Sequence, residues 1–439
     1  MPSENGDSLH IAINAQRSPN GGAGGVESVL IGLVSALGRL EDGDEEYIII
    51  GPWENPDWLK PYMGPNQRLM RGPKPEDDQR PFETVPAWLR SAARSVHKWL
   101  YDFVNPPSNG FNVPLSKGFY ENLGCDVIHF PDQRFTLCAL PSVYNPHDLQ
   151  HLHYPQFFKP SLIQWRESVY QAGCHYARVV VAGSQWVKND LVEQYGLSPE
   201  KIQVIPWGAP TWAIAEPTQE LLQSMREKYN LPSEFAFYPS MLWEHKNHLR
   251  LLAALAELRD QERLTVRLVC TGNLQSTFWP TIRQSIEKLN LDSQVQFLGM
   301  VSPEELRAIY KLSQFVIVPT LFEAASGPVF EAWYEHVPVA CSTVTSLPEQ
   351  AGNAALLFDP FSIEEIANAV QRMATDEQLR DSLRKRGRHR LMDFSWERTA
   401  KAYRAVYRRA AGRPLSEEDR QLLSWDWMRN PQRIDAETP

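Results

Sequence analysis

The chain has 439 residues, enough for roughly two or three domains, and 43% of them are hydrophobic, which predicts a large buried core. The net charge of −9 argues against a broadly basic nucleic-acid-binding surface, so we expect no nucleic-acid partner. The five cysteines lie far apart and form no paired metal or redox motif, which is typical of reduced core residues.

Residues 1–9 are polar without a signal-peptide core, and no apolar run approaches the ~20 residues of a membrane helix. We therefore expect a cytoplasmic protein whose membrane contact is at most peripheral, at the inner face of the membrane. From residue 10 onward, short apolar strands alternate with longer helical patterns. In the first half, the predicted strands are residues 10–14, 47–51, 126–130, 142–145 and 178–182. The predicted helices there are residues 26–40 and 186–195.

The second half repeats this rhythm after a Pro/Gly-rich stretch at 205–217. Its predicted strands are residues 235–238, 266–270, 295–298, 315–318 and 337–341. Its predicted helices are residues 247–258 and 303–312. Such alternation predicts parallel sheets covered on both faces, so two series predict two Rossmann-like α/β domains that face each other across a cleft. Ligands of such sheets bind beyond the carboxyl ends of the strands.

A glycine-rich loop follows the first predicted strand. Gly22, Gly24 and Gly25 precede a predicted helix, and a loop of this kind lets the backbone come close to a phosphate or a sugar. The loop does not match the G-x-G-x-x-G nicotinamide fingerprint, because Glu27 occupies the last glycine position. A flexible turn explains the glycines equally well.

Residues 88–103 form an amphipathic pattern. Trp88, Trp99 and Phe103 fall on one helical face, while Arg90 and Arg94 fall on another. Packing onto the domain core is the favoured interpretation. Peripheral contact with a membrane interface is the alternative, because basic amphipathic helices with tryptophans lie in such interfaces.

His147 and Asp148 follow a predicted strand, with His151 and His153 close behind. No nearby carboxylate or cysteine completes a zinc ligand set, so we expect no metal. At a strand end facing a cleft, His147 and Asp148 are placed to bond a sugar hydroxyl or to order the site. His151 and His153 are expected to pack beside it.

Two segments of the second half carry candidate donor-binding residues. Lys246, with Ser240 before it, lies where a strand ends and a helix begins, and there it can neutralise a diphosphate whose charge grows as it leaves. Glu323 and Glu331 flank a turn of small residues, with Pro328 where a helix should begin. Free amides at such a helix start bind anions, and carboxylates bind hydroxyls, so this combination suits a sugar nucleotide. A solvated lysine and solvated glutamates explain each residue taken alone.

The candidate segments together resemble glycosyltransferase family 4, the retaining GT-B enzymes. That family's motif E-G-F-G-L-P-x-x-E-A continues toward P-V, S-x-x-x-L-P-E and G-x-A-A-L-L-F-x-P. The resemblance spans nearly the whole chain. The residues that carry it are 22–27, 147–148, 184–190, 205–208, 245–247, 323–332, 338–339, 346–349, 352–360 and 394–397.

The resemblance implies a GT-B fold with an acceptor-side domain at 1–210, a nucleotide-sugar-binding domain at 211–395, and a C-terminal helix and tail at 396–439 that cross back onto the N-terminal domain. Glu331 should hold the ribose hydroxyls, Glu323 the donor sugar and Lys246 the diphosphate. His147, with Asp148, should sit near the transferred sugar. The amides of Ala325, Ser326 and Gly327 should cap the phosphates or touch the sugar.

The chain also departs from the family pattern. Members usually carry an arginine five or six residues before the lysine, where Met241 and Ser240 stand here, so one positive charge is missing or comes from elsewhere. Ala324, Ala325 and Ser326 replace the usual Gly-Phe-Gly, which narrows the turn.

We therefore expect a metal-independent, retaining hexosyltransferase without a cofactor. It would move a sugar, with mannose favoured, from a nucleotide diphosphate sugar to a glycan or lipid-linked acceptor in surface polysaccharide biosynthesis. The alternatives are a sugar-nucleotide epimerase or phosphorylase of the same fold, and a non-catalytic protein that binds sugar nucleotides.

Overall fold

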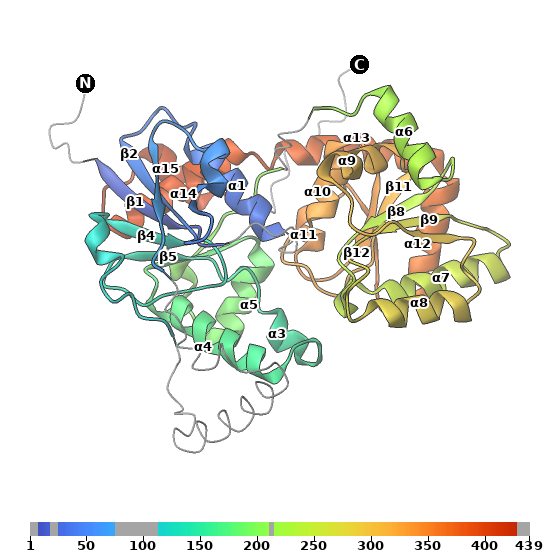
Figure 1. Cartoon of the computed structure of the whole chain (residues 1–439), viewed down its shortest axis with the longest axis horizontal. Helices are drawn as coiled ribbons and strands as arrows, with labels where there is room; N and C mark the ends of the chain where they lie inside the picture. Colours follow the sequence, from blue (N-terminus) through green and yellow to red (C-terminus); the bar gives the residue numbers. More distant parts are fainter. Residues whose placement is uncertain (1–7, 18–24, 75–112, 210–214, 428–439) are drawn as a thin grey trace, which may run out of the picture.

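The computed structural model describes residues 8–17, 25–74, 113–209 and 215–427 (Figure 1). Gly22, Gly24 and the predicted amphipathic helix at 88–103 lie outside these ranges. So do residues 210–214, and the predicted boundary at 210 therefore stays a prediction. In the described part of the chain, no helix is long and apolar enough to cross a bilayer.

The N-terminal domain is built on a parallel sheet with the strand order β3-β2-β1-β4-β5-β6-β7. Its strands are β1 (Leu9–Asn14), β2 (Glu45–Gly51), β3 (Gln67–Arg71), β4 (Val127–Phe130), β5 (Ser142–Tyr144), β6 (Val179–Ala182) and β7 (Ile202–Val204). Its α-helices are α1 (Gly25–Leu37), α3 (Gln150–His153), α4 (Pro160–Tyr176) and α5 (Gln185–Tyr195). Alternate residues of β1 point to opposite faces of the sheet. Leu9, Ile11 and Ile13 join the core beneath α1, while Ala12 joins the core beneath α4.

The C-terminal domain is built on a second parallel sheet with the order β10-β9-β8-β11-β12-β13. Its strands are β8 (Ala236–Pro239), β9 (Leu268–Thr271), β10 (Val295–Phe297), β11 (Phe315–Val318), β12 (Val339–Ser342) and β13 (Leu356–Phe358). Its α-helices are α6 (Gln219–Tyr229), α7 (His248–Gln261), α8 (Trp279–Lys288), α9 (Pro303–Leu312), α10 (Gly327–Tyr334), α11 (Leu347–Ala351), α12 (Ile363–Thr375) and α13 (Glu377–Met392). The two domains lie side by side in Figure 1, which is the arrangement of a GT-B fold.

The chain then returns to the N-terminal domain through α14 (Trp396–Ala411) and α15 (Glu417–Ser424), as Figure 1 shows in red beside the blue elements. Ser395 caps α14, and the first residue of this helix, Trp396, is buried against α1 and the segment that follows β7. A Cβ atom at Gly32 or Gly208 would lie within 2.3 Å of this ring, so only glycine permits the close approach. The crossing back implied by the resemblance is confirmed.

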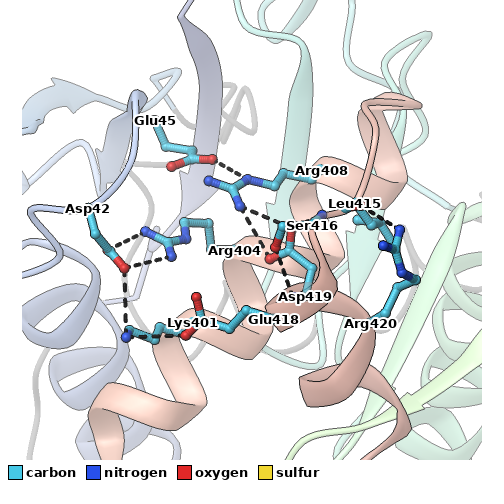
Figure 2. Close-up of polar contacts among 10 residues, drawn as sticks. All are labelled: Asp42, Glu45, Lys401, Arg404, Arg408, Leu415, Ser416, Glu418, Asp419 and Arg420. Carbon is cyan, nitrogen blue, oxygen red and sulfur yellow. Dashed lines mark hydrogen bonds and ion pairs between the residues drawn. The ribbon is translucent and has the colours of Figure 1, made fainter. Parts of the chain in front are cut away.

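Charged pairs hold α14 and α15 in place (Figure 2). Arg404 donates two hydrogen bonds to Asp42, at 2.6 and 3.2 Å, and this guanidinium holds the pKa of Asp42 down at about 2. Arg408 donates to Glu45 at 2.6 Å and to Asp419 at 3.0 Å. Because Glu45 and Asp419 are each only 3% exposed, losing Arg408 would leave two buried carboxylates uncompensated.

Candidate active site

A cleft of about 550 Å³ opens where the carboxyl ends of the two sheets face each other. Most of the residues predicted from the sequence line it. They are Gly25, His147, Asp148, Ser240, Lys246, Glu323, Ala325, Gly327 and Glu331. The parallel topology accounts for this convergence, since each of these residues lies in the loop after a strand or near the start of the next helix.

The turn at 323–327 joins β11 to α10 and presents its small residues to the cleft. Ala325 and Gly327 line the cleft, whereas Ser326 is fully buried. The amide of Ser326 donates to Oε1 of Gln350 at 2.8 Å, so this amide is already used inside the protein. Of the three residues whose amides were predicted to bind the donor, Ala325 and Gly327 are the ones that line the cleft.

Lys246 ends a short 3₁₀ turn, η5 (Glu244–Lys246), between β8 and α7. The next residue, Asn247, has a φ of 62° and donates to the carbonyls of Pro319 and Pro360, both at 2.9 Å. These bonds tie the lysine turn to the loops after β11 and β13. Ser240 lies in the same loop, with its Oγ 3.2 Å from Nε2 of His248.

The ammonium group of Lys246 forms an ion pair with the carboxylate of Glu323. The two side chains are only 15% and 13% exposed, so each satisfies a charge that would otherwise be desolvated without a partner. Lys246 and Glu323 therefore form a largely buried ion pair at the wall of the cleft.

Glu331 stands one turn into α10, and its Oε2 accepts a hydrogen bond of 2.6 Å from the hydroxyl of Tyr310. Burial raises the pKa of Glu331 above its ordinary value, against the lowering effect of this hydrogen bond. A carboxylate that is desolvated and has one oxygen bonded inside the protein gains most from hydroxyl donors supplied by a ligand.

His147 lines the same cleft from the N-terminal domain, and its backbone is left-handed with a φ of 67°. Its Nε2 lies 2.9 Å from the carbonyl oxygen of Pro131 and must carry the proton that this bond needs. Burial lowers the pKa of His147, so the ring is neutral and Nδ1 is left as an acceptor. Trp207 meets the ring edge-on, with centroids 5.8 Å apart.

Asp148 also lines the cleft, where its Oδ1 accepts from the amide of Gln150 at 3.0 Å. His151 and His153 instead bond carboxylates of the same domain, Glu167 at 2.6 Å and Asp190 at 2.8 Å. Among the described residues, no group of three or more His, Cys, Asp or Glu side chains is placed to hold a metal ion.

The cleft contains residues that sequence reasoning missed. Arg17 and Arg166 line it from the N-terminal domain. Arg17 lies 3.9 Å from Asp132, and Arg166 lies 3.9 Å from Asp148. Lone arginines outside any motif leave no local signal in a single sequence. Their presence means that Lys246 is accompanied by cations from the opposite wall.

Two family models match the chain. The model described as "Glycosyltransferase Family 4" matches residues 23–212, and the model described as "Glycosyl transferases group 1" matches residues 223–390. The first match runs through the N-terminal sheet from α1 onward, and the second contains the whole C-terminal sheet.

Curated relatives are similar at a lower level. O-antigen chain mannosyltransferase B of Escherichia coli is 25% identical over 268 residues, which cover 59% of this chain and 69% of the relative. D-inositol 3-phosphate glycosyltransferase of Corynebacterium aurimucosum is 27% identical over 238 residues, 53% of this chain and 56% of the relative. Serotype-specific mannosyltransferase WbdA of Escherichia coli is 26% identical over 226 residues, and this match spans 28% of the relative's length.

Solved structures share the fold over most of the chain. Sucrose-phosphate synthase from Thermosynechococcus elongatus superposes with a TM-score of 0.65 at 21% identity, covering 91% of this chain and 98% of that one. HepE of Anabaena, solved in complex with UDP and glucose, superposes with a TM-score of 0.61 at 18% identity, covering 91% and 99%. At these identities the likeness supports the two-domain fold alone.

Proposed function

Because the chain belongs to glycosyltransferase family 4, with a C-terminal domain of the group 1 type, we propose that it is a retaining hexosyltransferase. It would move a sugar from a nucleotide diphosphate sugar to a glycan or lipid-linked acceptor in polysaccharide biosynthesis. The observation that carries this proposal is the convergence of Lys246, Glu323 and Glu331 on one wall of a cleft whose opposite wall holds His147. Mannose is the favoured sugar, because two of the relatives are named as mannosyltransferases.

The proposed reaction depends on electrostatic stabilisation of the leaving nucleoside diphosphate. Lys246 would leave Glu323 to meet the negative charge that grows on the phosphates, and the start of α10 would add its amides. Glu331 would hold the ribose through its hydroxyls, and Glu323 would hold hydroxyls of the donor sugar. The acceptor hydroxyl would attack the anomeric carbon from the face that the diphosphate leaves. The new glycosidic bond would form as the bond to the phosphate oxygen breaks, the departing diphosphate would take the hydroxyl proton, and the reaction would need no metal.

The roles of the N-terminal wall follow from its hydrogen bonds. Neutral His147 would accept at Nδ1 a hydrogen bond from a hydroxyl of the transferred sugar, since its Nε2 is engaged with the carbonyl of Pro131. Asp148 would order the same wall by accepting the hydrogen bond from the amide of Gln150, the first residue of α3.

The peripheral membrane contact predicted for 88–103 stays a prediction. Liposome binding that is unchanged in Trp99→Glu would argue against it.

Thermal-shift titrations with UDP, GDP, dTDP and ADP test the donor base, because a ligand that binds only the folded state stabilises it. Release of nucleoside diphosphate is then measured with the matching sugar nucleotides, with and without glycan acceptors, and GDP-mannose is tried first. Acceptor-dependent release that Glu331→Ala abolishes would support the proposal. Binding without turnover would instead favour a non-catalytic sugar-nucleotide-binding protein, and conversion to another sugar nucleotide without an acceptor would favour an epimerase.

A further inference from the structure

Two side chains from one segment hold the two ends of the 323–327 turn. At one end, Oγ1 of Thr345 accepts from the amide of Glu323 at 3.1 Å and donates to the carbonyl of Glu323 at 2.5 Å. At the other end, the side-chain amide of Gln350 accepts from Ser326 N at 2.8 Å and donates to Ser326 O at 2.9 Å. These side-chain bonds add to two longer backbone bonds at the same carbonyls, from Ser346 N to Glu323 O and from Phe330 N to Ser326 O, each at 3.4 Å.

The backbone of Thr345 is strained. Its φ is 51°, and a β-branched residue rarely adopts the left-handed region because Cβ crowds its own backbone. Such a conformation persists only where surrounding contacts determine it, and it gathers at functional sites. Thr343, two residues earlier in the same loop, points its hydroxyl elsewhere, to the carbonyl of Phe358 at 3.3 Å. The hydroxyl bonds to the backbone of Glu323 therefore come from Thr345 and not from Thr343.

The same segment also contacts the N-terminal domain. The hydroxyls of Ser346 and Ser184 lie 2.7 Å apart, and both residues are almost completely buried. Ser184 is the N-cap of α5, and the next amide, that of Gln185, donates to Glu349 at 2.9 Å. Residues 345–350 therefore touch the opposite domain on one side and hold the 323–327 turn on the other.

We infer that Thr345 and Gln350 are positioning residues for the donor sugar, an inference that rests on the proposed function. They act through Glu323 and through the turn that follows it, by fixing the backbone from which the carboxylate reaches the cleft. The contacts of Ser346 and Glu349 with the N-terminal domain make this position depend on the docking of the two domains. Groups that meet a reacting sugar need tight placement, because a shift of ~1 Å can cost about 100-fold in rate.

The first test compares Thr345→Val, Thr345→Ser and the control Thr343→Val. We expect Thr345→Val to lower kcat with the sugar nucleotide on the order of tenfold. It should also weaken binding of the sugar nucleotide while the Kd of the nucleoside diphosphate stays within about twofold of wild type. Thr345→Ser keeps the hydroxyl and should restore both quantities, and Thr343→Val should leave both unchanged.

The ratio of the two Kd values separates positioning from folding, because a loss of folded protein lowers activity without changing that ratio. If Thr345→Val does not fold, Gln350→Met tests the other end of the turn. Its matched control is Gln294→Met, since Gln294 is also buried and bonds a backbone carbonyl, that of Val266, away from the cleft. An unchanged ratio and kcat in Thr345→Val or in Gln350→Met would overturn the inference. A wild-type protein that consumes no sugar nucleotide would instead overturn the proposed function.

Discussion

Replacing Glu331 by glutamine should stabilise the protein and weaken its hold on the ribose at the same time. Burial raises the pKa of Glu331, so the folded protein binds this proton more tightly than the unfolded chain does. The contribution of this group to stability is therefore present below the ordinary pKa of 4.5 and is lost as the pH rises through the folded pKa. At neutral pH, Glu331→Gln removes the charged form and still offers Tyr310 an acceptor, so the melting temperature should rise.

The size of the binding effect follows from the hydrogen bonds involved. A hydroxyl bonded to a carboxylate contributes ~1.5–3 kcal/mol, which corresponds to roughly 10- to 150-fold in Kd. A hydroxyl bonded to the neutral amide contributes ~0.5–1.5 kcal/mol, or roughly 2- to 12-fold. The Kd ratio of 2′-deoxy-GDP to GDP should therefore be large in the wild type and should shrink in Glu331→Gln, if GDP is the nucleotide that stabilises the protein. The other ribonucleotides are tested in the same way.

Isothermal titration with the ribo and deoxy forms measures this ratio, and calorimetric melting at pH 7 measures the stability. Glu335→Gln is the matched control, because Glu335 closes the same helix, is buried and pairs with Arg307 at 2.6 Å. Glu335→Gln should lower the melting temperature, because it removes the charge that pairs with Arg307, and it should leave the Kd ratio of the deoxy to the ribo form unchanged. If Glu331→Gln keeps the full wild-type ratio, Glu331 does not bind the ribose. If the melting temperature of Glu331→Gln falls, the partly buried carboxylate is not the destabilising group inferred from the direction of its pKa shift.

Three further outcomes are expected. Asp42→Asn should remove up to ~1 kcal/mol of stability at pH 7, a discounted figure because this carboxylate is 47% exposed. Because the pKa of Asp42 is lowered in the folded protein, the extra stability of the wild type over Asp42→Asn is present above pH 3.8 and is lost as the pH falls through about 2. The free energies of unfolding of the two proteins, measured with urea, should therefore converge across that range. Gly208→Ala should cost ~1–3 kcal/mol, because the new Cβ would lie 2.3 Å from Trp396, whereas Gly183→Ala meets its nearest neighbour at 3.9 Å and should be tolerated. Lys246→Ala should weaken binding of the nucleoside diphosphate roughly 10-fold or more and leave the nucleoside unaffected, and equal losses for both ligands would contradict the assignment to the diphosphate.

The sequence alone determined the class of fold and the segments that carry the candidate site. Buried strands such as β6 and β11 are continuous apolar runs, and the helices between the strands keep a helical pattern, so local periodicity was sufficient. The strands that the pattern missed, β3, β7 and β13, have a weaker signal. β7 and β13 have three residues each, and all three strands lie at sheet edges, where burial is partial. Lys246, Glu323 and Glu331 were found because each follows a strand end or begins a helix with a recognisable turn.

Only the tertiary structure decided which partners these residues have. The pairing of Lys246 with Glu323, the bond from Tyr310 to Glu331, and the arginines on the opposite wall join segments that are far apart in the chain. The same holds for Thr345 and Gln350, whose neighbours along the chain do not reveal a role in holding the 323–327 turn. Periodicity reports which face of an element is buried, whereas contacts between distant segments depend on how the two sheets and the returning α14 pack together. The sequence therefore determined where the site residues stand along the chain, and packing decided which of them meet.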